Sequence, residues 1–294
     1  MGSFYGCLAD SQQQYKKSLM NPINIGIFGC TGRVGRRLCV LTEEHPELTL
    51  SVALCHELVG KPLYEVESQI PKSCSLVVVS PTDLGKLAVK PDVIVDFSAP
   101  AGTVTCVRQA ATLGIPMVIG TTGLNPDQEA VIRTASQKIP IIHAMNFSLG
   151  VNLLVQVAST VAAALGEDFN IEIVEAHHNK KVDAPSGTAL ALADSVCQAL
   201  GRSREDLVQG REGIVGKRST REIGVHALRM GSVVGDHTVH FGSEFERIEL
   251  THRAQNRDVF ASGALRAARW LANKPPGMYT MADVLFNQSE KSEN

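Results

Sequence analysis

The stretch that decides the fold is "INIGIFGCTGRVGRRL", residues 23–38. Its first part alternates Ile with small residues and ends in Phe, as expected for a buried strand. Gly29, Gly32 and Gly35 then follow in the pattern G-x-x-G-x-x-G. Such glycines permit a tight turn, let a pyrophosphate approach the backbone, and let a helix pack closely on a strand. Because they stand where a strand ends and a helix begins, they predict a dinucleotide-binding turn; a purely structural turn is the alternative.

Short runs rich in Val and Ile extend this pattern through the first half of the chain. Their nearly continuous apolar character indicates strands buried on both faces, as in a parallel sheet covered by helices. The expected strands are 23–29, 49–55, 75–80, 92–98, 115–123 and 139–148. Helices are expected between them, near 32–44, 101–113 and 125–137. Repeated strand–helix–strand units predict a Rossmann-like, doubly wound α/β domain with its ligands at the carboxyl ends of the strands.

The pattern changes after residue 148. A long apolar helix comes first, then a strand and a helix, and from about residue 220 strand-like segments alternate with period 2, which predicts a mixed sheet with one open face. A last helical stretch begins at 258 and is expected to pack on the first domain. The expected division is a polar extension, 1–20, a dinucleotide-binding domain, 21–147 completed by 258–294, and an α+β substrate-binding domain, 148–257.

Composition excludes several classes of protein. The 28 basic and 30 acidic residues give a net charge of −2, without the basic tract that nucleic acid or a membrane surface would require. The first twenty residues lack the pattern of a signal peptide. The seven cysteines are scattered without a CxxC pair, which indicates neither a disulfide framework nor a zinc site. We therefore expect a cytoplasmic protein that binds no metal, membrane or nucleic acid.

The stretch "EAHHNKKVDAPSGTAL", residues 175–190, gathers proton carriers and cations beside a helix start. Ser186 is a good N-cap, so the free N–H groups of Gly187 and Thr188 should face an anion. Histidine titrates near neutral pH and lysine supplies positive charge, as an acid/base site for an anionic substrate needs. Taken one by one, these residues have plainer explanations, such as solvated lysines or an ion pair between Asp183 and a lysine.

The end of the second expected strand departs from the usual pattern for NAD. An acid about 20 residues after the glycine turn would hold the ribose hydroxyls. Cys55 and His56 stand there instead, and Glu57 comes one or two positions late. His56 and the arginines near the turn could instead meet a 2′-phosphate. These arginines are Arg33, Arg36 and Arg37.

With a dinucleotide fold before it, the stretch 175–190 resembles the signature of the 4-hydroxy-tetrahydrodipicolinate reductase family, also called dihydrodipicolinate reductase. Other segments resemble the same family in the same order. They include "GCTGRVGR", "DVIVDFSAP", "GIPMVIGTTG", "NFSLGVNLL", "VHALRMGSVVGDHTVHFGSEFERIELTHRA" and "GMYTMADVL". The resemblance covers about residues 22 to 286.

The resemblance implies roles for individual residues. His177 matches the acid/base residue and Lys181 the proton donor. The residues implied in substrate binding are His178, Ser186, Gly187 and Thr188. The residues implied or expected in cofactor binding are Gly29, Cys30, Thr31, Gly32, Arg33, Val34, His56, Gly120, Thr121, Thr122, Ala144, Met145, Asn146 and Phe147.

The resemblance also implies an activity, which is NAD(P)H-dependent reduction of 4-hydroxy-tetrahydrodipicolinate to tetrahydrodipicolinate in lysine and diaminopimelate biosynthesis. We expect NADPH or NADH as cofactor, with NADPH slightly favoured, a small dicarboxylate heterocycle as substrate, and a homotetramer assembled through the second domain's sheet. A non-catalytic dinucleotide sensor is the alternative. Such a protein would keep the glycine turn but could lose the acid/base residues, so the presence of His177, His178 and Lys181 argues against it. An aldehyde-oxidising dehydrogenase needs a nucleophilic cysteine, and Cys106 and Cys197 lie inside expected helices.

Overall fold

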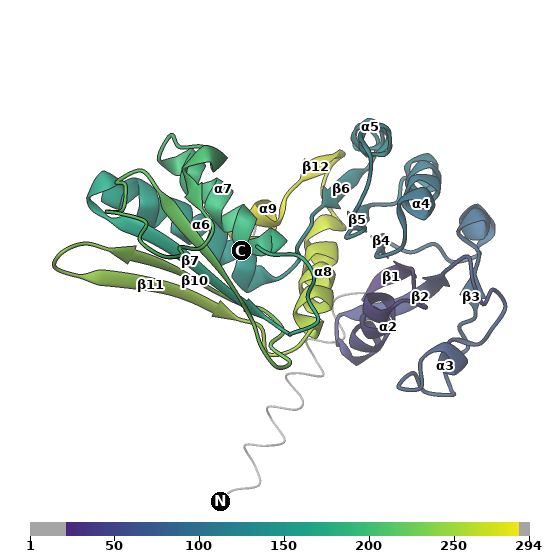
Figure 1. The fold of residues 1–294 in the computed structure, drawn as a ribbon. Helices are drawn as coiled ribbons and strands as arrows, with labels where there is room; N and C mark the ends of the chain where they lie inside the picture. Colours follow the sequence, from purple (N-terminus) through teal and green to yellow (C-terminus); the bar gives the residue numbers. More distant parts are fainter. Residues whose placement is uncertain (1–21, 288–294) are drawn as a thin grey trace, which may run out of the picture. The chain divides into compact units, whose positions relative to one another are not determined.

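The computed structural model describes residues 22–287, and Figure 1 shows their fold. The expected polar extension, 1–20, lies outside the described residues. The described chain forms two compact units. The first comprises residues 22–147 and 260–284, and the second comprises 148–259 and 285–287.

The first unit is built on a seven-stranded sheet in the order β12-β6-β5-β4-β1-β2-β3, with every neighbouring pair parallel. Its strands are β1 (Ile23–Phe28), β2 (Leu48–Leu54), β3 (Val78–Val79), β4 (Val93–Asp96), β5 (Met117–Ile119), β6 (Pro140–His143) and β12 (Gly277–Tyr279). Ile25, Ile27, Ile94 and Val95 are wholly buried, as strands covered on both faces require. The doubly wound α/β prediction is confirmed.

Helices flank this sheet (Figure 1). They are α2 (Arg33–Glu44), α3 (Leu63–Val66), α4 (Pro100–Leu113), α5 (Pro126–Ala135), most of α8 (Asp258–Leu271) and α9 (Met281–Phe286), with the 3-10 helix η1 (Pro81–Lys86). The predicted start of α5 is correct, because Asn125 and Gln128 form a reciprocal capping box. Helix α8 packs on the first unit, since a Cβ at Gly263 would lie 1.8 Å from the carbonyl oxygen of Phe147.

Three expected strands are too long. Residues 75–80 supply only Val78–Val79, residues 115–123 only Met117–Ile119, and residues 139–148 only Pro140–His143. Apolar residues continue past each pairing segment, so composition alone overestimates its length. After Ile119 and His143 the chain leaves the sheet at its carboxyl edge and forms the loops that carry expected cofactor residues.

The second unit has a mixed five-stranded sheet in the order β11-β10-β7-β9-β8. Its strands are β7 (Asn170–His177), β8 (Leu207–Val208), β9 (Ile223–Arg229), β10 (Asp236–Gly242) and β11 (Arg247–Arg253). Strand β7 pairs in parallel with β9 and antiparallel with β10. Alternate residues such as Ile171, Ile173 and Phe241 are wholly buried, while Glu172 and Thr238 are only partly covered. The predicted mixed sheet with one open face is confirmed.

Two helices, α6 (Leu149–Leu165) and α7 (Gly187–Ala199), supply the other half of this core, and the short 3-10 helices η2 (Gly166–Asp168) and η3 (Arg204–Asp206) follow them. With the turn after it, α6 is long and apolar enough to cross a membrane by length and composition. Core helices of globular proteins pass the same test. Leu154, Ala158 and Ala162 of α6 are buried in the core cluster of this unit, which explains its apolar character.

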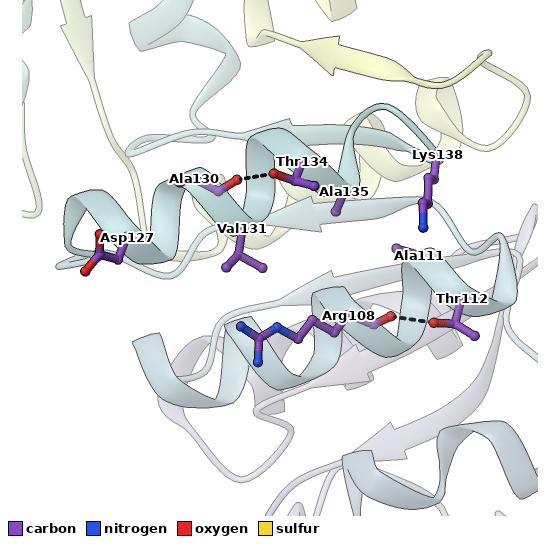
Figure 2. A pocket seen from close by; sticks show the side chains of 9 residues that line it. All are labelled: Arg108, Ala111, Thr112, Asp127, Ala130, Val131, Thr134, Ala135 and Lys138. Atoms are coloured by element: carbon purple, nitrogen blue, oxygen red, sulfur yellow. Dashed lines mark hydrogen bonds between the residues drawn. The ribbon is translucent and has the colours of Figure 1, made fainter.

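Figure 2 shows a groove of about 490 Å³ between α4 and α5 in the first unit. Its lining is Arg108, Ala111, Thr112, Asp127, Ala130, Val131, Thr134, Ala135 and Lys138. The Thr112 and Thr134 hydroxyls donate to carbonyl oxygens of their own helices. None of the expected site residues lines this groove, so the candidate site lies elsewhere.

Candidate active site

The glycine turn joins β1 to α2. Gly29 has a positive φ of 86°, and a Cβ there would lie 2.6 Å from the carbonyl oxygen of Phe97. A Cβ at Gly35 would lie 1.9 Å from the carbonyl oxygen of Gly29, so only glycine lets the helix approach the turn this closely. Gly32 is the N-cap of α2 and has no side chain to offer to the helix start. The first backbone N–H groups of α2 are therefore suited to binding a phosphate.

The end of β2 holds a buried thiol at the position where NAD-binding proteins usually have an acidic residue that binds the ribose. Cys55 is 9% exposed and its Sγ lies 3.1 Å from the Thr31 Oγ1. His56 and Glu57 are exposed, and the His56 ring meets the Phe28 ring edge-on at 5.7 Å. The residue nearest the turn is thus a cysteine in place of an acid.

The three arginines near the turn differ in their bonding. Arg36 donates from Nε to the carbonyl oxygen of Thr31 at 2.9 Å, and Arg37 donates to the Gln69 side chain. Arg33 is exposed at the first position of α2. Arg33 is therefore the arginine best placed to meet a phosphate.

The loops after β4, β5 and β6 lie at the same carboxyl edge, because these strands are parallel neighbours. Asp96 is wholly buried and accepts hydrogen bonds from the Ser98 N–H at 2.9 Å and the Thr121 hydroxyl at 3.3 Å. Burial raises the pKa of Asp96 to about 6, although its hydrogen bonds oppose the rise. The loop containing Gly120 is thereby tied to the end of β4.

Phe97 connects two of these loops. A Cβ at Gly120 would lie 2.3 Å from its ring, and the buried Phe147 ring lies 5.6 Å away. The expected cofactor segments 120–122 and 144–147 are thus gathered around one aromatic side chain. Met145, in the second segment, is 73% exposed. Sequence reasoning missed Phe97, although "DVIVDFS" contains it directly after the strand.

In the second unit, β7 ends at His177, next to a buried carboxylate. Glu175 is wholly buried, and its Oε2 lies 2.7 Å from the His177 Nδ1. Arg229 donates to both carboxylate oxygens at 2.8 Å, and the Ser186 N–H donates to Oε1 at 3.0 Å. Burial alone would raise the pKa of Glu175, but the hydrogen bonds from Arg229, His177 and Ser186 lower it overall. Glu175 is therefore an ionised acceptor.

His237, on β10, closes another side of the His177 ring. It is 3% exposed, its ring meets that of His177 edge-on at 5.2 Å, and its Nε2 lies 3.2 Å from the Ser186 Oγ. Burial lowers the pKa of His237 to about 4, and the neighbouring His177 adds to this effect. His237 is therefore neutral at physiological pH.

Positive charge gathers in the loop after His177. Lys181 Nζ lies 2.8 Å from the Asp183 Oδ1, which is the ion pair considered from the sequence. Arg257 Nη2 lies 3.3 Å from the His178 Nε2, and the Lys180 N–H donates to the His178 Nδ1 at 3.2 Å. Desolvation and Arg257 lower the pKa of His178. This cluster presents more donors than acceptors, which suits an anionic ligand.

The start of α7 lies beside the same residues. Ser186 is its N-cap, with Oγ accepting from the Ala189 N–H at 3.2 Å, as predicted. A Cβ added to Gly187 would meet nothing within 4 Å among the described residues. The start of α7 is thus uncrowded at Gly187, while the N–H groups of Ala189 and Leu190 are bonded to Ser186.

The structure joins the expected residues of the second unit into one cluster and adds residues that the sequence did not indicate. Arg229 and His237 are more than 50 positions from Glu175. They meet it because β9 and β10 flank β7, with His177 opposite Arg229 and Glu175 opposite His237. Only Glu175 had a local signal, since it stands two positions before His177 on the same strand. Arg257 had none.

A Rossmann-like unit with a glycine turn, together with a unit that holds a carboxylate–histidine pair beside an exposed helix start, is the arrangement expected of a nicotinamide-dependent oxidoreductase. Comparison with known proteins agrees. The family model "Dihydrodipicolinate reductase, N-terminus" matches residues 23–147, and "Dihydrodipicolinate reductase, C-terminus" matches residues 150–285. The chain belongs to the dihydrodipicolinate reductase family.

Individual relatives cover nearly the whole chain. The 4-hydroxy-tetrahydrodipicolinate reductase of Psychrobacter arcticus is 43% identical over 94% of this chain and 98% of its own length. That of Myxococcus xanthus is 42% identical over 88% and 96%. The solved structure of dipicolinate-bound dihydrodipicolinate reductase from Paenisporosarcina sp. TG-14 superposes with a TM-score of 0.72 at 26% identity, covering 89% of this chain and 98% of that one.

Proposed function

We propose that this oxidoreductase reduces 4-hydroxy-tetrahydrodipicolinate to tetrahydrodipicolinate with NADPH or NADH, in lysine and diaminopimelate biosynthesis. The observation that carries the proposal is the His177–Glu175 pair at 2.7 Å, beside the open start of α7, in a chain of this family. A relative with dipicolinate bound supports a flat heterocyclic dicarboxylate as the ligand class.

The first unit takes the dinucleotide. The residues present fit such a group, because the turn at Gly29 and Gly35 leaves backbone where any side chain would collide. The start of α2 faces the pyrophosphate, and the loops 120–122 and 144–147 border the nicotinamide end. Bound reduced nicotinamide supplies the hydride. NADPH serves at least as well as NADH, because Cys55 replaces the acid that would repel a 2′-phosphate and Arg33 is exposed nearby.

The second unit takes the substrate and the proton chemistry. One substrate carboxylate accepts hydrogen bonds from the N–H groups at Gly187 and Thr188, with Ser186 shaping the turn. His178 and Lys181 supply donors to the ligand. The 4-hydroxyl of the substrate is lost as water, which leaves a conjugated C=C–C=N system in the ring. Hydride addition to this system leaves negative charge on the acceptor, so a proton must follow. His177 or Lys181 delivers this proton, and the positive charge of Lys181 stabilises the developing negative charge.

The second unit also forms the oligomer. A cytoplasmic homotetramer assembles through the open face of its mixed sheet, where Val174, Thr238 and Thr251 lie side by side in register. The partners are then copies of the chain and a small molecule, with no nucleic acid or membrane. The balanced charge of the chain is consistent with this assignment.

A non-catalytic dinucleotide sensor is the alternative. The cluster around His177 argues against a sensor, because binding a dinucleotide does not require a buried carboxylate–histidine pair for proton transfer. Retention of dinucleotide binding without turnover is what distinguishes a sensor from the reductase.

The decisive experiment follows oxidation of NADPH and of NADH by the purified protein, using the condensation product of aspartate semialdehyde and pyruvate as substrate. We expect oxidation only when substrate, protein and cofactor are all present, and competitive inhibition against the substrate by dipicolinate. Binding of either dinucleotide without oxidation would contradict the reductase and favour the sensor.

A further inference from the structure

We propose that Glu175 is a positioning residue that holds His177 with its proton on Nδ1, so that Nε2 is the atom that exchanges a proton with the substrate. Arg229 keeps Glu175 ionised for this role, and Gly235 keeps Nε2 accessible. The proposal rests on the proposed function and deepens it, since it assigns the proton-exchanging atom.

The protonation of His177 follows from the hydrogen bonds of Glu175. The Glu175 carboxylate receives two bonds from Arg229 and one from the Ser186 N–H, and it is wholly buried. A buried carboxylate paired this closely with a guanidinium stays ionised, and an ionised carboxylate can only accept. At 2.7 Å the His177 Nδ1 must therefore be the donor. The remaining nitrogen, Nε2, accepts when the ring is neutral and donates when it is charged.

The surroundings of Nε2 agree with this assignment. A Cβ at Gly235 would stand 3.1 Å from the His177 Nε2, so a larger residue there would crowd that atom. The His177 side chain is 12% exposed, so the ring is largely covered. His237 packs edge-on against the ring from β10 and is itself tied to Ser186. The Nδ1 side of the ring is thus held by Glu175, and glycine at position 235 leaves Nε2 uncrowded.

The same strand offers a matched control. Glu172 also lies 2.7 Å from a histidine nitrogen, that of His226, and it also accepts from arginines, Arg211 and Arg218. It differs in lying on the open face of the sheet, because it is three positions from Glu175 and strand residues alternate between faces. Loss of either carboxylate removes from β7 a hydrogen-bond acceptor that is paired with arginine. Only loss of Glu175 changes the surroundings of His177.

The kinetic test compares Glu175→Gln, Glu175→Asp and Glu172→Gln. In Glu175→Gln the amide oxygen still serves Arg229, and the amide nitrogen then faces Nδ1 as a donor, which favours the opposite tautomer. We expect kcat to fall by about 10- to 100-fold, the range seen when a group that orients a metal-bound histidine through its other nitrogen is lost. KM for the dinucleotide and inhibition by dipicolinate should change little. Glu175→Asp should recover part of kcat, and Glu172→Gln should keep it.

A second readout does not depend on turnover. NMR of the protein with isotope-labelled histidine reports which ring nitrogen carries the proton, and His177→Gln assigns the signal. We expect the Nδ1–H form in the wild type, Glu175→Asp and Glu172→Gln, and the Nε2–H form in Glu175→Gln. An Nε2–H wild type, or wild-type kcat in Glu175→Gln, overturns the proposal. If Glu175→Gln does not fold, the wild type and Glu175→Asp still decide. A protein without reductase activity but with the expected tautomer would refute the proposed function and leave the positioning of His177 intact.

Discussion

At the scale of single residues, the site depends on what each side chain is bonded to. His177 and His178 are adjacent in sequence, yet one is hydrogen-bonded to a carboxylate and the other lies beside a guanidinium. Desolvation and the Arg257 guanidinium lower the pKa of His178. The two side chains therefore have different partners, and we propose proton exchange at His177 and ligand contact at His178.

The first prediction concerns proton delivery. Replacing His177 with Gln, or Lys181 with Ala, should lower kcat about 10²- to 10⁴-fold, as expected for loss of a general acid. Dinucleotide affinity should change little, because both residues belong to the second unit. Lys180→Ala is the matched control, since Lys180 contacts His178 only through its backbone N–H in the contacts described. Steady-state kinetics and dinucleotide titration measure both effects, and near-normal turnover in both variants would contradict the assignment.

The second prediction concerns pH and His237. Burial lowers its pKa from 6.5 to about 4, so between these values the unfolded chain binds more protons at this residue than the folded chain. The stability that neutral His237 contributes is complete above pH 6.5 and is lost as the pH falls toward 4. The loss amounts to about 3 kcal/mol at 1.36 kcal/mol for each pKa unit.

The check is the urea midpoint of unfolding against pH for the wild type and His237→Asn. The variant should be less stable at pH 7, because it loses packing and the bond to Ser186, but its stability should decline less between pH 6.5 and 4. Asp96, whose raised pKa acts in the opposite direction, is present in both proteins and cancels in the comparison. Glu172, with its pKa lowered to about 2, contributes only below pH 4.5. Parallel curves would refute the assignment to His237.

At the scale of elements, the turn between β1 and α2 sets the geometry of the dinucleotide site. Its glycines are needed for two different reasons, a positive φ at Gly29 and a close approach of the helix at Gly35. The same turn contacts the end of β2 through Thr31 and Cys55. The turn and the strand end are therefore held together at the place where we propose that the adenosine side of the cofactor binds.

The third prediction tests the close approach. Gly35→Ala places a Cβ 1.9 Å from the carbonyl oxygen of Gly29, so the helix or the turn must move. We expect weaker binding of NADPH and NADH alike, and a fall in stability of roughly 1–3 kcal/mol, as for other overpacked sites. Gly85→Ala is the control, since its Cβ would meet nothing within 4 Å among residues 22–287. Calorimetric binding and thermal unfolding measure both. Unchanged binding in Gly35→Ala would argue that the turn does not hold the cofactor.

The fourth prediction concerns cofactor choice. Cys55→Glu introduces a carboxylate at the end of β2, which accepts from ribose hydroxyls and repels a 2′-phosphate. The ratio of kcat/KM for NADPH to that for NADH should fall about 10-fold or more, since desolvated like charges cost several kcal/mol. Cys55→Ser, of similar size and neutral, is the control. A wild type that strongly prefers NADH, or a ratio unchanged in Cys55→Glu, would show that another element decides the choice.

At the scale of the whole molecule, the two units divide the labour. We propose that the parallel sheet binds the dinucleotide at the carboxyl edge of its strands. The mixed sheet buries one face under α6 and α7, and its other face stays open. The open face carries Val174 between Thr238 and His226, and we expect it to pack against another copy of itself.

The fifth prediction concerns assembly through that face. Thr238→Arg places a charge at the centre of the open face, opposite Thr251 and Val174. We expect the wild type to sediment with four times the mass of one chain and the variant to sediment as smaller species. Dinucleotide binding should persist, because its residues belong to the first unit. A tetrameric variant, or a monomeric wild type, would contradict assembly through this sheet.

The sequence by itself determined the fold class, the glycine turn, the helix start near residue 125, the N-cap at Ser186 and the position of the histidine stretch. These features are local, because a strand–turn–helix junction or a cap is specified by a few consecutive residues. Strand lengths at 115–123 and 139–148 were overestimated, since apolar residues continue beyond the point where pairing stops.

Only the tertiary structure decided what surrounds His177. Arg229 and His237 reach Glu175 through the pairing of β7 with β9 and β10, and Arg257 reaches His178 from beyond β11. No local pattern specifies such contacts, because strand order depends on how the whole sheet buries its apolar face. The pairing of the buried Glu175 with Arg229, which keeps this carboxylate ionised and therefore an acceptor, is likewise a property of the packed sheet and of no single segment.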